Sequence, residues 1–397
     1  MADRRQNGWS STEGIETLRS ILKRLIPQWP NGPYDWQLTV TANVLDGRDQ
    51  LLVTACGDGK TAAAYLHLLV RQELYRDPKL PRYGAKVVQN PVGIMVGPLV
   101  DLGISQVAEM ERVGVRAVAL DTQSITKAQE QGKDLYKEVK ACSRAMVIVS
   151  PERLTAAVFD KILRHDKFRD SLVSFAADEA HIIAPWALDF RLAYWEISRA
   201  RLRIPQGVPM LAMTATLRMG STEHSLVRLL GFRQGYHTLR RSSERKNVQT
   251  VYTNLSHGLD GYEFPDIAWV ARGKKKVVIY CKSIDLCQRV TSYLRRLRPP
   301  GPSRLRNIRM YHSFKWADSN AETLKAFQED PDTFCIVATI KFGMGVDVRN
   351  IDVIINLGLP DTIENDHPQR GRAMRDPRSY GVGITYCEMG IVSALRK

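Results

Sequence analysis

Short apolar runs alternate with amphipathic stretches along most of this chain, and this rhythm constrains the fold more than any other feature of the sequence. Such runs are typical of buried strands, whereas the stretches between them, such as 61–76 and 101–113, have the spacing of helices. Strands that alternate with helices predict a mostly parallel sheet with helices on both faces. Because nine strands are many for one sheet, we expect two sheets. The runs are LLVTA (51–55), VGIMVG (92–97), AMVIVS (145–150), LVSFAA (172–177), PMLAMTA (209–215), KVVIYC (276–281), FCIVAT (334–339), VIINLG (353–358) and GVGITYC (381–387).

A polar stretch, RRSSERKN (240–247), separates two series of these elements and marks the expected join between two domains. Basic residues outnumber acidic ones on both sides of it: 32 − 25 = +7 up to residue 240, and 25 − 17 = +8 after it. The total of +15 is typical of a protein that binds a polyanion, usually a nucleic acid. Twelve of the basic residues lie between Arg272 and Arg309 against one acid, Asp285, and they either contact phosphates or form a solvated surface.

A glycine-rich turn follows the first apolar run directly and leads into a helical stretch. The turn reads Cys56, Gly57, Asp58, Gly59, Lys60, Thr61. Glycines allow backbone N–H groups to wrap phosphates, and the start of a helix adds positive potential. Lys60 is expected to reach the β- and γ-phosphates of a nucleotide, and the Thr61 hydroxyl to hold Mg²⁺. Asp58 is unusual so close to phosphates, and we expect its side chain to point outward.

A pair of carboxylates ends the run LVSFAA, 118 residues after Lys60: Asp178 and Glu179, followed by Ala180 and His181. A carboxylate at the tip of a strand parallel to the strand before the phosphate loop is placed to hold Mg²⁺ through water. The next carboxylate can orient and deprotonate an attacking water. Together with the loop, this pair predicts a nucleotide hydrolase.

These motifs resemble those of superfamily-two helicases, and among them the RecQ-like DNA helicases, over nearly all of residues 30–390. Gln37 resembles the residue that contacts the adenine edge, and the segments 96–107 and 149–154 resemble motifs that touch the nucleic-acid backbone. The stretch DEAHIIAPWALDFRLAY (178–194) resembles the aromatic-rich loop that couples DNA binding to hydrolysis. The resemblance implies coupling or nucleic-acid roles for His181, Trp186, Phe190, Arg191, Thr214, Thr216 and Thr339. Leu188 stands where the family usually has histidine.

The second half is similar to the family in VVIYCKS (277–283), YHSF (311–314), VATIKFGMGVD (337–347) and QRGRAMRD (369–376). The last motif implies that Arg372 and Arg375 stabilise charge on the γ-phosphate in the transition state, an effect worth about 10³–10⁵ in rate. Three residues depart from the family pattern: Cys56, Gln369 and Met374.

The resemblance implies a fold of two tandem RecA-like P-loop domains with mostly parallel sheets: an N-terminal extension (1–30), an ATP-binding domain (31–240) and a helicase C-terminal domain (241–397). It implies a 3′–5′ DNA helicase or translocase that couples ATP hydrolysis, with Mg²⁺, to movement on single-stranded or forked DNA. It also implies a nuclear location and roles in DNA repair and recombination. We expect a monomer, and the sequence does not indicate which proteins it binds. We expect this chain to be a core fragment or a reduced family member, because it shows no counterpart of the zinc-binding and winged-helix modules common in this family.

The six cysteines form no CxxC pair, and no Cys/His quartet has zinc-finger spacing, so no structural zinc is expected. The absence of an 18-residue apolar stretch or a signal peptide predicts an intracellular protein without membrane spans. Two alternatives remain open: an RNA-directed helicase, and a nucleotide-binding scaffold with weak turnover that binds nucleic acid. The intact Lys60, Glu179, Arg372 and Arg375 argue against the scaffold.

Overall fold

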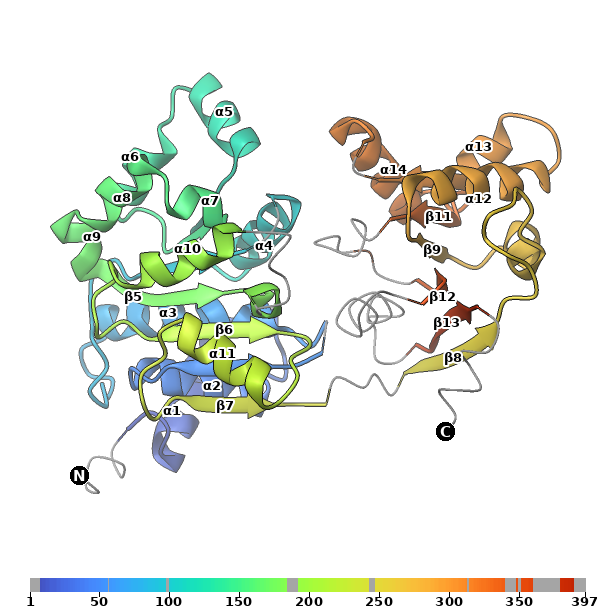
Figure 1. Ribbon diagram of the computed structural model, residues 1–397. Helices are drawn as coiled ribbons and strands as arrows, with labels where there is room; N and C mark the ends of the chain where they lie inside the picture. Colours follow the sequence, from blue (N-terminus) through green and yellow to red (C-terminus); the bar gives the residue numbers. More distant parts are fainter. Residues whose placement is uncertain are drawn as a thin grey trace. The chain divides into compact units, whose positions relative to one another are not determined.

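A computed structural model describes residues 8–55, 57–97, 100–183, 192–242, 247–312, 314–339, 348, 351–359 and 379–388, with the side chains of 100–102, 182–183, 192–196 and 317 excepted. The chain divides into two compact units, and most of the chain up to Ser242 forms the first. The division at Ser242/Ser243 lies within the polar stretch at 240–247. Each unit is built on its own sheet (Figure 1).

The first unit contains a seven-stranded sheet in the order β3-β4-β2-β5-β6-β1-β7, and every neighbouring pair in it is parallel. Its strands are β1 (Gln50–Val53), β2 (Val92–Val96), β3 (Ala117–Leu120), β4 (Met146–Val149), β5 (Leu172–Ala177), β6 (Met210–Thr214) and β7 (His237–Arg240). Its helices are α1 (Thr12–Leu25), α2 (Asp35–Leu45), α3 (Lys60–Arg76), α4 (Val100–Arg112), α5 (Thr122–Glu130), α6 (Leu135–Lys140), α7 (Pro151–Leu154), α8 (Ala157–Leu163), α9 (Asp166–Ser171), η2 (Ala180–Ile183), α10 (Leu192–Arg201) and α11 (Ser221–Leu229).

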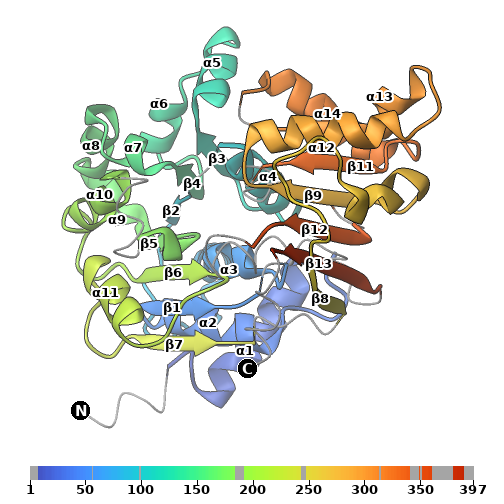
Figure 2. The same cartoon turned by 45° about the vertical axis from the view of Figure 1, so that its right-hand side comes forward.

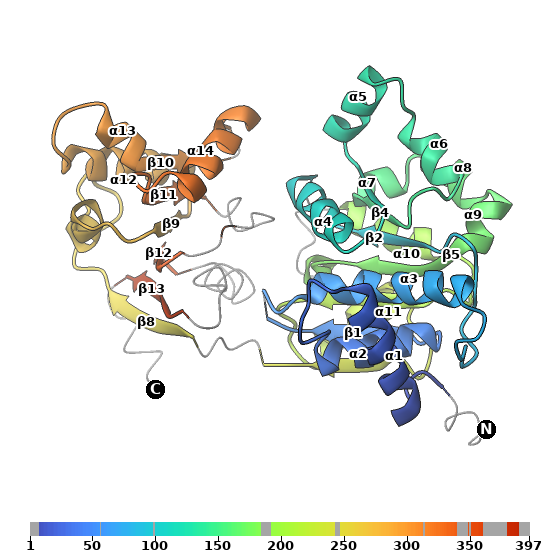
Figure 3. The ribbon, with the colours of Figure 1, turned by 180° about the vertical axis from the view of Figure 1, so that it is seen from behind.

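Successive strand residues of the first sheet enter two different cores, because side chains alternate between its faces. Leu52 belongs to the core under α1, α2 and α3, whereas Leu51 and Val53 belong to the core that includes residues of α8 to α11. Figure 3 shows α1, α2 and α3 on one face, and Figure 1 shows α10 and α11 on the other. Burial on both faces explains why these strands read as continuous apolar runs.

The described part of the predicted N-terminal extension, residues 8–30, packs into the first unit. Trp9 is fully buried, and its indole Nε1 donates a hydrogen bond to the Arg82 carbonyl at 2.9 Å. Leu18 and Leu22 of α1 lie in the same core as α2 and α3. Residues 9–26 therefore contribute to the stability of the first unit.

The second unit contains a six-stranded sheet in the order β10-β11-β9-β12-β13-β8, again with parallel neighbours. One face packs against α12 and η4, and the other against α14 (Figure 2). The core includes four buried cysteines, Cys281, Cys287, Cys335 and Cys387. The elements are β8 (Val248–Asn254), η4 (Pro265–Arg272), β9 (Val277–Cys281), α12 (Ile284–Arg296), α13 (Ser303–Asn307), β10 (Ile308–Tyr311), α14 (Ala317–Glu329), β11 (Cys335–Ala338), β12 (Val353–Leu357) and β13 (Gly381–Cys387).

The expectation of an α/β fold with two mostly parallel sheets is confirmed. All nine apolar runs contain strands, but the described residues hold four more: β3, β7, β8 and β10. These four are the outermost strands of the two sheets. Edge strands pair on one side only. β7, β8 and β10 contain half-buried or exposed residues, which weakens their apolar pattern, whereas the four residues of β3 are apolar and buried and were simply missed.

Candidate active site

The glycine-rich turn joins β1 to α3 at the carboxyl edge of the first sheet. Gly57 and Gly59 have φ angles of 88° and 84°, which L residues with a Cβ rarely adopt. A Cβ on Gly59 would also lie 3.0 Å from Nε2 of Gln37. The two glycines therefore let the chain turn sharply from the strand into α3, which begins at Lys60.

Lys60 and the carboxylate pair meet at this edge although they lie far apart in the sequence. The Lys60 ammonium donates to Oε1 of Glu179 at 2.9 Å and lies 3.6 Å from Oδ1 of Asp178. The side chains of Lys60 and Asp178 are buried, with exposed fractions of 10% and 2%, whereas 21% of the Glu179 side chain is exposed. The arrangement places one cation and two anions where a phosphate chain and a water could be held.

The Asp178 carboxylate is fixed on both oxygens. Its Oδ2 accepts from Nε2 of Gln106 on α4 at 2.9 Å, and its Oδ1 accepts from the Glu179 backbone N–H at 2.9 Å. Burial raises the pKa of this carboxyl group, although the charge of Lys60 acts in the opposite direction. Gln106 lies in the segment 96–107, but nothing in the sequence singled it out.

Glu179 is a non-glycine residue in the left-handed region, with φ of 48°. Such a conformation costs free energy and persists where surrounding contacts impose it, commonly at functional sites. Here the ion pair with Lys60 contributes one of those contacts.

His181 joins the carboxylates to the end of β6. Its Nδ1 lies 2.8 Å from Oγ1 of Thr214 and 3.4 Å from Oε2 of Glu179. The Thr214 hydroxyl donates to the Thr216 carbonyl at 3.0 Å, and the Thr216 N–H donates back to that hydroxyl at 3.3 Å. A change at Glu179 can therefore be transmitted to the segment after β6 through these side chains.

Two residues that were predicted to bind the nucleotide, Gln37 and Asp58, form hydrogen bonds within the protein. Gln37 accepts from the Tyr34 N–H at 2.9 Å and donates to the Gly59 carbonyl at 3.0 Å, so it ties α2 to the glycine-rich turn. Asp58 was expected to point outward, but its Oδ2 accepts from the Thr54 hydroxyl at 2.6 Å. Thr61 lies half-buried at the second position of α3.

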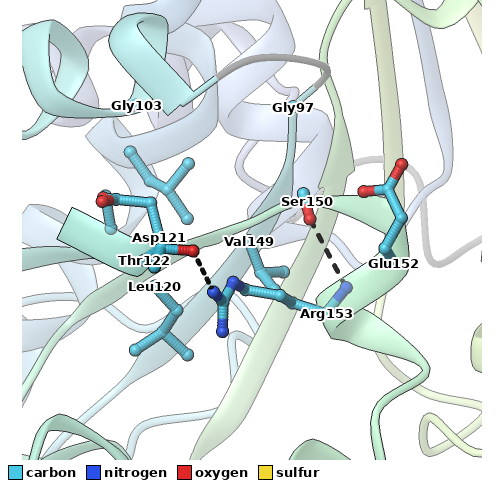
Figure 4. A pocket seen from close by; sticks show the side chains of 11 residues that line it. Gly97, Gly103, Leu120, Asp121, Thr122, Val149, Ser150, Glu152 and Arg153 are labelled. Atoms are coloured by element: carbon cyan, nitrogen blue, oxygen red, sulfur yellow. Dashed lines mark hydrogen bonds between the residues drawn. The ribbon is translucent and has the colours of Figure 1, made fainter. Parts of the chain in front are cut away.

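A pocket of about 340 Å³ opens at the same sheet edge, at the ends of β2, β3 and β4. Arg153 crosses it, as Figure 4 shows, and donates to the Thr122 hydroxyl at 2.6 Å and to the Tyr136 hydroxyl at 3.2 Å. Both partners are neutral, although the carboxylates of Asp121 and Glu152 also line the pocket. The segments 96–107 and 149–154 supply part of this lining, but Thr122 was missed because β3 was not predicted.

In the second unit, most of the basic cluster at 272–309 is engaged within the protein. Arg289 and Arg306 pair with carboxylates of Asp285 and Asp330, each at 2.8 Å, and Arg295 donates to the Ile308 carbonyl. These contacts favour a structural role for much of the cluster. Thr339 follows β11, and its N–H donates to the Tyr311 carbonyl at 3.4 Å.

Six predicted site residues lie outside the described residues: Cys56, Trp186, Phe190, Arg191, Arg372 and Arg375. Within the described ranges, no cluster of three or more metal-ligating side chains occurs. No helix in that part of the chain is both long and apolar enough to cross a bilayer.

Two family profiles match this chain. The profile of the DEAD/DEAH box helicases matches residues 34–224, and that of the helicase conserved C-terminal domain matches residues 265–377. An ATP-dependent DNA helicase RecQ of Pasteurella multocida is 28% identical over 333 residues, which are 84% of this chain and 46% of the relative. The ATP-dependent helicase wrn-1 of Caenorhabditis elegans is 28% identical over 344 residues, 86% of this chain and 29% of that protein. The chain thus spans less than half the length of these relatives.

Solved structures share the fold at low sequence identity. The helicase MrfA bound to DNA and AMPPNP matches with a TM-score of 0.72 and 17% identity, covering 96% of this chain and 52% of MrfA. Dbp5 of Saccharomyces cerevisiae bound to RNA and ADP BeF3 matches with a TM-score of 0.70 and 16% identity, covering 98% of this chain and 93% of Dbp5. These likenesses confirm two tandem RecA-like domains.

Proposed function

Because this chain carries the two-part core of the DEAD/DEAH-box helicases of superfamily two, we propose that it is an ATP-dependent DNA translocase of RecQ type that moves 3′–5′ on single-stranded DNA. The observation that carries the hydrolytic part is the contact between Lys60 and the adjacent carboxylates, which lie 119 and 118 residues away in the sequence. The RecQ relatives support DNA as the substrate.

ATP binding is assigned to the turn between β1 and α3. The backbone N–H groups of this turn and the start of α3 favour phosphates, and Lys60 would exchange its carboxylate partners for the β- and γ-phosphates. Gln37, which already holds the Gly59 carbonyl, would set the position of the turn relative to the adenine.

The side chains at this edge fit Mg²⁺, which prefers oxygen ligands. Thr61 offers a hydroxyl, and Asp178 offers a carboxylate that Gln106 already orients. When bound, the ion would neutralise negative charge on the phosphates. Asp178 would hold it through water.

Glu179 is proposed as the group that orients the attacking water and accepts its proton. His181 and Thr214 would report the loss of the γ-phosphate to the segment after β6. Arg372 and Arg375 belong to the same proposal as the guanidinium groups that stabilise the transition state, and Trp186, Phe190 and Arg191 as contacts to unpaired bases.

The pocket that holds Arg153 is proposed as a contact to the phosphate backbone. Its guanidinium has hydroxyl partners, and the pocket lies at the sheet edge used by the predicted hydrolytic site. Thr339 in the second unit is proposed as a further backbone contact. Nuclear location and a role in DNA repair or recombination follow from the family resemblance and belong to the same proposal.

The rate of ATP hydrolysis, measured side by side with single-stranded DNA, duplex DNA and RNA, tests this function. We expect single-stranded DNA to stimulate hydrolysis most and Lys60→Ala to abolish it. Preferential stimulation by RNA would instead identify an RNA-directed helicase. A hydrolysis rate that is the same with and without each nucleic acid would favour the nucleotide-binding scaffold.

Directionality requires a separate assay. A strand-displacement substrate with a 3′ single-stranded tail should be unwound, or a protein block on that strand displaced, faster than its 5′-tailed counterpart. Equal rates on the two substrates would contradict 3′–5′ movement.

A further inference from the structure

The phosphate loop of this chain carries an acid where a triphosphate would bind. Asp58 lies between Gly57 and Gly59, and a carboxylate so close to the loop repels phosphates. Its Oδ2 accepts from the hydroxyl of Thr54, the residue after β1, at 2.6 Å. This bond turns the carboxylate back toward the sheet but leaves its charge in place.

A cation stands beside this carboxylate. The Nε of Arg241 lies 3.6 Å from Oδ2 of Asp58. The backbone N–H of Arg241 donates to the Val53 carbonyl at 2.8 Å, which continues the pairing of β7 with β1 by one residue. The position of the arginine is therefore fixed by the sheet and does not depend on the ion pair alone.

An aromatic ring holds the guanidinium from another side. The guanidinium carbon of Arg241 lies 5.5 Å from the centroid of the Trp36 ring, within the range of a cation–π contact. Trp36 is 8% exposed and precedes Gln37, which donates to the Gly59 carbonyl. Three segments, the start of α2, the phosphate loop and the end of β7, thus converge around one arginine.

The pair is poorly suited to stabilising the fold. Its side chains are 43% and 28% exposed, and ion pairs with such exposure contribute little to folding free energy. Its main effect is on the electrostatic potential at the loop, because the arginine cancels the charge of the acid.

We propose that Arg241 is a positioning residue for nucleotide binding: it neutralises Asp58 and thereby allows a phosphate loop with an internal acid to bind a triphosphate. This inference rests on the proposed binding of ATP to the loop. It assigns to Arg241 a role through Asp58 and not a direct contact with phosphate.

The test is a charge-balanced set of variants of the full chain, with the dissociation constant of a fluorescent N-methylanthraniloyl-ATP measured in the presence of Mg²⁺. Arg241→Ala leaves a net negative charge at the loop and should weaken binding about tenfold. Asp58→Asn leaves a net positive charge and should tighten it by a similar factor. The double variant restores neutrality and should return to within about twofold of the wild type.

Two further variants separate charge from local packing. Arg241→Lys keeps the charge and should stay near the wild-type affinity, and salt should shrink the effect of Arg241→Ala. Arg240→Ala removes a neighbouring guanidinium that pairs with Glu223, and it should leave the affinity unchanged.

A double variant as weak as Arg241→Ala would overturn the inference, because it would mean that the arginine acts on the nucleotide directly. Wild-type affinity in Arg241→Ala would overturn it as well. Failure of the proposed function is distinguishable from both: the wild-type chain would then bind no nucleotide, or Lys60→Ala would bind it as tightly as the wild type.

Discussion

Glu179→Gln should tighten the binding of ATP while it stops hydrolysis. In the structure, the Lys60 ammonium donates to the Glu179 carboxylate at 2.9 Å, so a nucleotide must compete with this carboxylate for the lysine. Glutamine has the same shape and keeps a carbonyl acceptor, but it carries no charge. The substitution therefore weakens the competing contact but keeps a side chain of the same length at this residue, whose backbone φ is 48°.

The size of the effect follows from the two kinds of hydrogen bond. A bond to a charged group contributes about 1.5–3 kcal/mol, and a neutral one about 0.5–1.5 kcal/mol. A difference of about 1–1.5 kcal/mol corresponds to a dissociation constant about five to ten times lower. Loss of a general base lowers the rate of the chemical step about 10²–10⁴-fold.

Nucleotide affinity is measured by equilibrium titration with a fluorescent ATP analogue, and turnover by phosphate release at saturating ATP. Glu130→Gln is a matched control, because Glu130 is an exposed carboxylate on α5, away from Lys60. Unchanged or weaker binding in Glu179→Gln would refute the competition for Lys60. Wild-type turnover would refute the role of Glu179 as the base.

Three further outcomes are expected. Arg153→Ala should reduce the log–log salt slope of single-strand binding by about 0.7, the value of one phosphate contact, and an unchanged slope would remove the pocket from the interface. Arg233→Ala should lower the free energy of unfolding in urea by about 2–3 kcal/mol, because it leaves the buried Asp49 carboxylate without its cationic partner, and the 39% exposure of the arginine reduces this loss. The cost should shrink as the pH falls below about 4. Burial raises the pKa of Asp49, but Arg233 and the Met210 N–H together lower it below its ordinary value, so the carboxylate stabilises the fold above that pH. Burial also lowers the pKa of His67 to about 3, so stability should fall as the pH drops from about 6.5 towards 3, and His67→Leu should flatten this dependence whereas the exposed His224→Gln should not.

The interior strands could be predicted from the sequence because the sheets bury them on both faces. β4 and β9 read as uninterrupted apolar runs, and every residue in them is buried. β7 and β8 contain mostly half-buried or exposed residues and carry polar side chains, so a search for apolar runs passes over them. Position at a sheet edge is a property of the tertiary fold, which local sequence does not record.

The candidate site was predictable where a backbone requirement or a reacting group fixes the residue type. The two glycines of the turn, Lys60 and the carboxylate pair belong to this class. Gln106 and Arg241 do not, because an amide on a helix and an arginine after a strand are common in any sequence. Their roles depend on distances to Asp178 and Asp58, which the sequence separates by 72 and 183 residues.

The buried cysteines of the second unit can report how often its hydrophobic core opens. Cys281, Cys287, Cys335 and Cys387 are between 0% and 2% exposed, and burial raises the pKa of the Cys335 thiol, so an alkylating reagent can modify them only when the surrounding core separates. Pulsed alkylation followed by peptide mass spectrometry would therefore measure the rate at which the core opens, without any engineered label. Cys142, which is 2% exposed, gives the corresponding measurement for the first unit, so both units can be followed in one experiment.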